Sequence, residues 1–189
     1  MARGGERILV LGTANQHKVE EITHILDGGW LVEPHDPEVE ETGATFEENA
    51  LLKARAVAMA TGDLAAADDS GIEIDALGGA PGIHSARWTY ESDWVPRVLR
   101  ELREVPRGER GCRYVCAAAA VWPDGREVVV RGTVEGVITR VPRGTGGFGY
   151  DPIMEPVEGD GRTFAEMTPD EKHALSHRAR AFRTLKQYL

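Results

Sequence analysis

Cysteine is scarce in this sequence, and long apolar runs are absent from it. The two cysteines, Cys112 and Cys116, do not form a CxxC motif, so we expect buried free thiols rather than a disulfide. No apolar run approaches the roughly 18 residues that a membrane-spanning helix needs, and the first residues lack the apolar stretch of a signal peptide. The sequence therefore predicts a cytoplasmic protein with no membrane partner.

Positive charge is also in deficit. The chain carries 22 basic and 31 acidic side chains, which gives a net charge of −9. A surface this acidic repels a nucleic-acid backbone, and this argues against a nucleic-acid partner. A small phosphate compound stays possible, because a bound divalent cation reverses the local charge.

What is present fits one globular domain over residues 1–189. The hydrophobic fraction of 41% and the charged fraction of 28% are ordinary for a globular protein. Periodicity and turn signals predict strands and helices mixed in one compact unit, which indicates an α/β or α+β class. Strands are expected at 8–11, 30–32, 64–67, 71–76, 114–122 and 127–137, and helices at about 15–28, 45–61, 91–104 and 168–189.

The segment Thr13–Glu21 follows the first expected strand and begins a helix. Free N–H groups at a helix N-terminus and the positive end of the helix dipole favour an anion, and Lys18 in the first turn adds a full charge. The same pattern is typical of a capped surface helix with a solvated lysine, since it is neither a Walker loop nor GxGxxG. Both interpretations stay open on this segment alone.

Two carboxylates stand together at Asp68-Asp69, where an apolar strand is expected to end. Burying them there is costly unless a metal or hydrogen-bond donors compensate, although an Asp-Asp-Ser-Gly turn is the alternative. Glu41 in the acidic loop is a candidate Mg²⁺ ligand, because that cation takes a few carboxylate oxygens; a solvated charge run has the same composition. Asn49 and Lys53 are one helical turn apart and can face one site.

Two further segments offer contacts for a planar base. The first has two aromatic rings beside a carboxylate, in Phe148-Gly149-Tyr150-Asp151. Such rings can stack on a base and the carboxylate can accept a hydrogen bond from it, although a strand with alternating aromatics also fits. The second segment is the last expected helix, with donors at Lys172, Ser176, His177 and Arg178. His173 and His177 in this segment are four residues apart, a spacing that can bind zinc. No third ligand accompanies them, which argues against a zinc site.

Taken together, these motifs resemble the inosine/xanthosine triphosphate pyrophosphatase family over nearly the whole chain. Each motif is weak alone, and their shared order makes the resemblance specific. Trp88 and Pro96 depart from the family's pattern, outside the implied site. The motifs are Thr13-Ala14-Asn15-x-x-Lys18-x-x-Glu21, Glu40-Glu41-Thr42-Gly43, Phe46-x-Glu48-Asn49-Ala50-x-x-Lys53-Ala54, Ala67-Asp68-Asp69-Ser70-Gly71, Gly78-Gly79-Ala80-Pro81-Gly82-x-x-Ser85-Ala86-Arg87, Gly146-Gly147-Phe148-Gly149-Tyr150-Asp151-Pro152, Ala165-Glu166-Met167 and Ser176-His177-Arg178.

The resemblance implies an α/β fold, a two-lobed single domain in which helices flank a long mixed β-sheet and a central cleft takes the substrate. It implies a homodimer and a Mg²⁺ cofactor held by Glu41 and Asp69, with Asp69 also as the general base. Around the triphosphate it places Thr13, Ala14, Asn15, Gln16, His17, Lys18, Lys53 and Ser70. Around the nucleoside it places Phe148, Gly149, Tyr150, Asp151, Lys172, His177 and Arg178.

The implied activity is hydrolysis of non-standard purine nucleoside triphosphates (ITP, dITP and XTP) to the monophosphate and pyrophosphate. Lys172, His177 and Arg178 offer donors to the 6-oxo group of these bases, where adenine carries an amino donor. Two other classes stay open: a sensor that binds a nucleotide without cleaving it, and a metal-dependent phosphomonoesterase. The three differ in their products, because only a pyrophosphatase releases pyrophosphate.

Overall fold

The fold is that of a computed structural model, which describes residues 7–26 and 28–189. The chain divides into two compact units. Unit 1 takes the chain up to Asp69, Cys116–Gly132 and Arg178–Leu189, and unit 2 takes Ser70–Val115 and Thr133–His177. The expectation of one functional domain over 1–189 stays a prediction.

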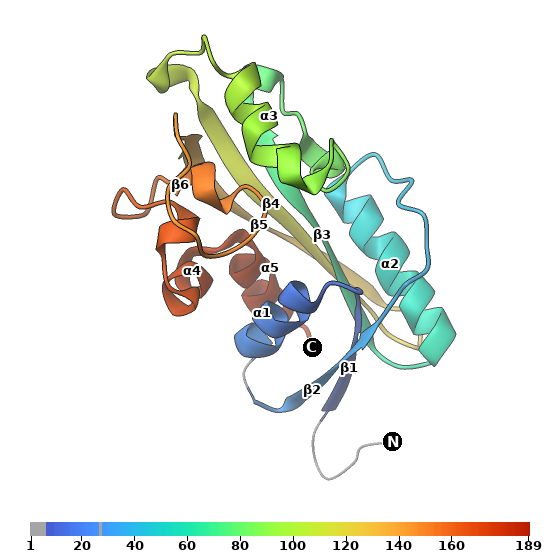
Figure 1. The fold of residues 1–189 in the computed structure, drawn as a ribbon. Helices are drawn as coiled ribbons and strands as arrows, with labels where there is room; N and C mark the ends of the chain where they lie inside the picture. The colour runs from blue at the N-terminus through green and yellow to red at the C-terminus, as the bar shows by residue number, and fades with distance from the viewer. Residues whose placement is uncertain (1–6, 27) are drawn as a thin grey trace. The chain divides into compact units, whose positions relative to one another are not determined.

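The strands of the described chain form a mixed, six-stranded β-sheet in the order β2-β1-β3-β4-β5-β6 (Figure 1). Strand β1 pairs in parallel with β2 and β3, whereas β5 and β6 are antiparallel. Helices accompany this mixed sheet, which confirms the predicted α/β class. The strands are Arg7–Gly12 (β1), Trp30–His35 (β2), Ala65–Ile74 (β3), Gly111–Val121 (β4), Glu127–Ile138 (β5) and Met154–Pro156 (β6).

Helices α1, α2 and α4 begin at the N-caps that the sequence predicts. Asn15 and Thr45 accept hydrogen bonds from first-turn N–H groups of α1 and α2, and Thr168 forms a reciprocal capping box with Glu171 at α4. Gly62 ends α2 in a left-handed conformation, with φ of 72°. The helices are Gln16–Leu26 (α1), Phe46–Thr61 (α2), Trp94–Glu101 (α3), Pro169–Leu175 (α4) and His177–Leu185 (α5).

Unit 1 has a hydrophobic core of its own. Apolar side chains from α1, β1, β4 and α5 meet in it, among them Leu11, Ile22 and Phe182, none of which is exposed. Helix α2 packs against β1 and helix α1 against β2 (Figure 1). Because Ala66 of β3 belongs to this core, the chain enters the Asp68-Asp69 pair from a fixed, buried strand.

A second core lies within unit 2. It is built from the part of β3 after Gly71, from α3, from the first half of β4 and from the 3-10 turns after residue 150. Ile72, Val98 and Phe164 are among its fully or almost fully buried members. This core carries the Phe148–Asp151 segment, because Tyr150 is itself one of its side chains.

Strand β3 corrects the sequence analysis, which expected separate strands at 64–67 and 71–76. One strand runs through Gly71. A side chain at Gly71 would overlap the Gly82 carbonyl and the Ser85 hydroxyl, and Ser85 instead accepts a hydrogen bond from the next residue of the strand at 2.9 Å. The loop that contains Gly82 and Ser85 therefore packs against a continuous strand and does not interrupt it.

The expectation of one helix over 168–189 is also wrong. Helix α4 ends at Leu175, its C-cap Ser176 has extended dihedrals (φ −63°, ψ 149°), and α5 begins at His177. Serine favours helix caps over helix interiors, because its hydroxyl competes for backbone hydrogen bonds. As a result, Lys172 and Ser176 do not share the face of one continuous helix. His177 falls in unit 2 and Arg178 in unit 1.

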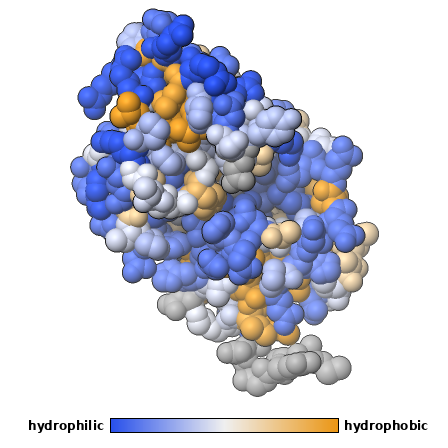
Figure 2. Space-filling model, in the orientation of Figure 1, coloured by the Kyte–Doolittle hydropathy of each residue, from blue (hydrophilic) through white to orange (hydrophobic). Residues whose placement is uncertain are grey.

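Hydrophilic residues dominate the face of the molecule drawn in Figure 2, and only small apolar groups interrupt them. Among the residues that the structure describes, no helix has the length and apolar character to cross a membrane. Cys112 and Cys116 are both free and buried, as the sequence predicts.

Candidate active site

Glu41 and Asp69 are held together in unit 1 by the ammonium group of Lys53. Lys53 Nζ lies 2.7 Å from Glu41 Oε1 and 3.7 Å from Asp69 Oδ1. Asn49, one turn earlier on α2, donates from Nδ2 to Asp69 Oδ2 at 3.0 Å, and its Oδ1 accepts from the Gly43 N–H at 2.8 Å. The loop before α2 and strand β3 thus bring one carboxylate each to a cation that α2 carries.

Burial and neighbouring charges of opposite sign act in opposite directions on the pKa values of Asp69 and Lys53. Burial raises the pKa of Asp69, and Glu41 adds to that effect while Lys53 and Asn49 oppose it. Burial lowers the pKa of Lys53, but the nearby carboxylates outweigh it, so that this pKa is raised as well. Lys53 is therefore charged at neutral pH, and Asp69 is more basic than an exposed aspartate.

Asp68 is the neighbouring carboxylate and is only 1% exposed. Its Oδ2 lies 3.0 Å from Lys18 Nζ and 3.5 Å from Arg178 Nε, and Arg178 also pairs with Glu21. Burial alone would raise the pKa of Asp68, but three nearby cations hold it far below its usual range. Asp68 is thus a permanent anion that fixes two cationic side chains, in contrast to the more basic Asp69.

The helix N-terminus that was predicted to bind phosphate is capped by its own side chain. Asn15 Oδ1 accepts from the N–H groups of His17 at 3.0 Å and Lys18 at 3.3 Å, and the Asn15 N–H donates to Thr13 Oγ1 at 3.1 Å. Two of the N–H groups offered to an anion are therefore used by the cap, and the Lys18 ammonium is paired with Asp68. The exposed residues of this turn are Ala14, Asn15, Gln16 and His17.

Asp151 organises the second group of predicted site residues, which lies in unit 2. It is 3% exposed and accepts hydrogen bonds from Tyr114 Oη at 3.1 Å, the Phe148 N–H at 2.9 Å and Lys172 Nζ at 2.8 Å. Lys172 Nζ also lies 4.4 Å from the centroid of the Phe148 ring. The carboxylate is engaged by protein donors, and it holds Lys172 beside the Phe148 loop.

Tyr150 and His177 are packed against other aromatic rings. Tyr150 stacks on Trp94 with ring centroids 5.7 Å apart, and its hydroxyl donates to a backbone carbonyl. His177 stacks on Tyr114 at 4.7 Å. The Tyr150 ring therefore belongs to the core of unit 2, while Phe148 is the half-buried aromatic of this loop.

The structure brings the predicted residues together in two groups. Unit 1 holds the predicted metal ligands, the predicted phosphate-binding residues except Ser70, and Arg178 of the nucleoside set. Unit 2 holds Ser70 and the rest of the nucleoside set, including Gly149. Sequence reasoning missed Tyr114, which contacts both Asp151 and His177, and it gave no role to Glu21, the partner of Arg178. The signal for Glu21 was present, since it is an acidic residue on the apolar face of α1.

A phosphate chain is a polyanion, and unit 1 places the cations Lys18 and Lys53 near the buried carboxylates Asp68 and Asp69. The site therefore has the features of an enzyme that acts on phosphate anhydrides. The chain belongs to the Ham1 family, whose model matches residues 9–188.

Curated relatives of this chain are named dITP/XTP pyrophosphatases, and a solved relative is named as a Ham1 protein. A dITP/XTP pyrophosphatase from Symbiobacterium thermophilum is 53% identical over 182 residues, covering 93% of this chain and 91% of the relative. One from Streptomyces coelicolor is 49% identical, covering 94% of each chain. The solved Ham1 protein of Staphylococcus aureus has a TM-score of 0.84 and 35% identity, covering 96% of this chain and 97% of its own. The fold and the family suggested by the sequence motifs are thus confirmed.

Proposed function

We propose that this protein hydrolyses the triphosphates of inosine, deoxyinosine and xanthosine to the monophosphate and pyrophosphate. The observation that carries the proposal is the half-buried Glu41 and the buried Asp69 joined by Lys53, in a chain whose relatives are named dITP/XTP pyrophosphatases. A sensor that only binds nucleotides gains little from burying a basic carboxylate, and no observation favours a phosphomonoesterase.

Glu41 and Asp69 are the residues proposed to hold Mg²⁺. No group of three or more His, Cys, Asp or Glu side chains suited to a metal occurs in the described residues. Two carboxylates nevertheless fit Mg²⁺, which commonly takes one or two from the protein and completes its shell with water and phosphate oxygens. The Lys53 ammonium already occupies a cationic position at this pair. When bound, Mg²⁺ supplies charge neutralisation of the phosphates.

The mechanism follows from the two aspartates. Asp69 has a raised pKa and is proposed to accept the proton of the water that attacks the α-phosphorus. Lys18 and Lys53 stabilise the negative charge that develops on the departing pyrophosphate. Asp68 keeps Lys18 in place through their 3.0 Å ion pair. No covalent intermediate is required, because water is the nucleophile.

The group around Asp151 is proposed to hold the base. Lys172 and His177 present donors to a 6-oxo acceptor, and adenine would set its amino donor against them, leaving buried donors unpaired. Arg178 was placed in the same set by the family resemblance, although its guanidinium also pairs with Glu21 and Asp68. Guanine shares the 6-oxo group, so these donors do not exclude it.

The test is product analysis over a nucleotide panel with Mg²⁺ and with excess chelator. We expect ITP, dITP and XTP to yield monophosphate and pyrophosphate only when the metal is present, with ATP a very poor substrate. Asp69→Asn keeps the side-chain shape and should lower kcat at least about a hundredfold. Asp124→Asn, at an exposed position in the β4–β5 turn, is the matched control. Release of orthophosphate alone, or full activity of folded Asp69→Asn, would contradict the proposal.

Two single variants test the proposed base-binding donors His177 and Arg178 one at a time. His177→Ala should lower kcat/KM for ITP far more than for ATP, whereas an equal loss on both would remove His177 from base recognition. Arg178→Ala is measured in the same assay, so that its effect can be compared with that of His177→Ala.

We also propose that the protein is a homodimer and that it lies in the cytoplasm, where the nucleotide pool is. Light scattering that gives the 20.6 kDa monomer mass would contradict the dimer. Cell fractionation tests the location.

A further inference from the structure

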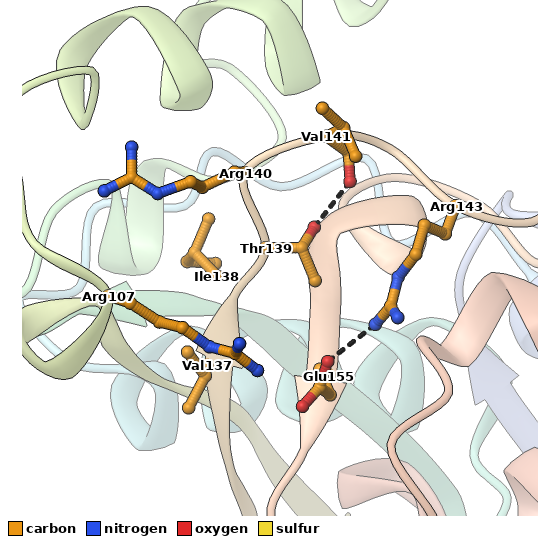
Figure 3. A pocket seen from close by; sticks show the side chains of 8 residues that line it. All are labelled: Arg107, Val137, Ile138, Thr139, Arg140, Val141, Arg143 and Glu155. Carbon is orange, nitrogen blue, oxygen red and sulfur yellow. Dashed lines mark hydrogen bonds and ion pairs between the residues drawn. The ribbon is translucent and has the colours of Figure 1, made fainter.

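A second concentration of positive charge lies in unit 2, around a cavity of about 220 Å³ (Figure 3). The cavity is formed by the last residues of β5, the segment 139–143 that follows, Glu155 of β6, and Arg107 from the 3-10 turn before β4. None of these residues belongs to the sets described above. Three of its lining residues are arginines: Arg107, Arg140 and Arg143.

The charges at this cavity are not balanced. Glu155 is the carboxylate of the lining and lies 2.6 Å from Arg143 Nη2, and Arg143 also lies 3.6 Å from Glu166 Oε2 and donates to the Gly161 carbonyl at 3.1 Å. Arg140 donates only to the backbone oxygen of Val105, at 3.4 Å, and in the described structure Arg107 has neither an ion pair nor a hydrogen bond. Two guanidinium groups thus lack a carboxylate, in a chain whose net charge is −9.

Solvated surface arginines are common, but the wall of this cavity argues for more than that. Arg110 is only 2% exposed and donates to the carbonyl oxygens of Ile138 and Thr139, both at 2.9 Å. The Thr139 hydroxyl donates to the Val141 carbonyl at 2.8 Å. Three acceptors of the lining are therefore already used within the protein. Glu155 is the one carboxylate among the lining residues that the structure describes, and the buried Arg110 guanidinium next to the lining adds positive potential.

We propose that this three-arginine cavity, defined by Arg107, Arg140 and Arg143, binds a small anion of the phosphate class, with pyrophosphate as the best match. The guanidinium fork fits phosphate oxygens in a bidentate manner. The apolar side chains of Val137 and Ile138 lower the local dielectric, which strengthens the attraction. The volume of about 220 Å³ suits an inorganic anion, whereas sites for larger organic ligands usually have volumes of at least about 300 Å³.

The test is calorimetric titration of the whole protein with pyrophosphate in excess chelator, compared with phosphate and with inosine monophosphate. The double variant Arg107→Ala/Arg140→Ala should lose one binding event, or bind at least about tenfold more weakly at it. Arg103→Ala is the matched control, because Arg103 is exposed and paired with its neighbour Glu104. Arg107→Lys/Arg140→Lys keeps the charge without the fork and should fall between wild type and the double alanine variant.

The outcomes are distinct from those of the catalytic proposal. The cavity event should persist in Asp69→Asn, and the double variant should keep wild-type hydrolysis when no pyrophosphate is added. Tighter binding of pyrophosphate than of inosine monophosphate identifies a free inorganic anion as the ligand, and equal binding identifies the phosphate of a nucleotide. Unchanged stoichiometry and affinity in the double variant, or an equal loss in Arg103→Ala, would overturn the proposal.

Discussion

Replacing Asp68 by asparagine should destabilise the protein strongly, because it removes one charge from a buried ionic network. Asp68 is 1% exposed and lies 3.0 Å from Lys18 Nζ and 3.5 Å from Arg178 Nε. Breaking a buried pair from one side costs about 3–5 kcal/mol, because the partner charge stays buried. Asparagine keeps the shape and can still accept from Lys18, so we expect about 3 kcal/mol, at the low end of that range. For a chain of this length, that lowers the Tm by about 6–12 °C.

The pH dependence gives this prediction a second, independent readout. The pKa of Asp68 is held far below its unfolded value, so its contribution to stability is complete above the unfolded pKa of about 3.9 and is lost as the pH falls toward the folded pKa. The difference in Tm between wild type and Asp68→Asn should therefore be constant from pH 7 to about 5 and shrink below about 4.

The assay is thermal and urea denaturation of wild type and Asp68→Asn between pH 3 and pH 7, followed by circular dichroism. Asp124→Asn makes the same chemical change at an exposed position paired with Arg126, and it should shift the midpoint little. A loss in Asp68→Asn no larger than that of the control, or a loss that stays constant down to pH 3, would refute the electrostatic reasoning.

Two further predictions concern packing and thiol chemistry. Gly71→Ala should lower the free energy of unfolding by about 1–3 kcal/mol in urea titrations, because its Cβ would overlap the Gly82 carbonyl and Ser85; unchanged stability would mean that the loop moves freely. Burial raises the pKa of both Cys112 and Cys116, so neither should react with a thiol reagent in the native protein while both titrate in guanidinium. Native reaction at the unfolded rate would contradict this.

The parts of the fold that depend on local chemistry were predictable from the sequence. The caps at Asn15, Thr45 and Thr168 each satisfy N–H groups within three residues of themselves, so that the same side chain signals and forms the helix start. The spacing of Asn49 and Lys53 indicated one helical face, and the structure places both against Asp69.

The errors arose where distant residues decide the local conformation. The Asp68-Asp69-Ser70 segment was expected to separate two strands, yet a loop ten or more residues later packs on Gly71 and β3 is continuous. Ser176 ends α4 although a periodic apolar pattern continues past it. The role of Tyr114 depends on contacts with Asp151 and His177, which are far along the chain, and nothing near Tyr114 signals them.

The contacts that Lys53 makes with both Glu41 and Asp69 have a consequence for the protein when no metal is bound. In many small metalloproteins, ligating side chains repel one another until the metal arrives, and the apo chain unfolds. Here the Lys53 ammonium keeps Glu41 and Asp69 together without a metal. If these two carboxylates hold Mg²⁺ as proposed, removal of the ion would leave their contacts with Lys53, and with them this part of unit 1, in place.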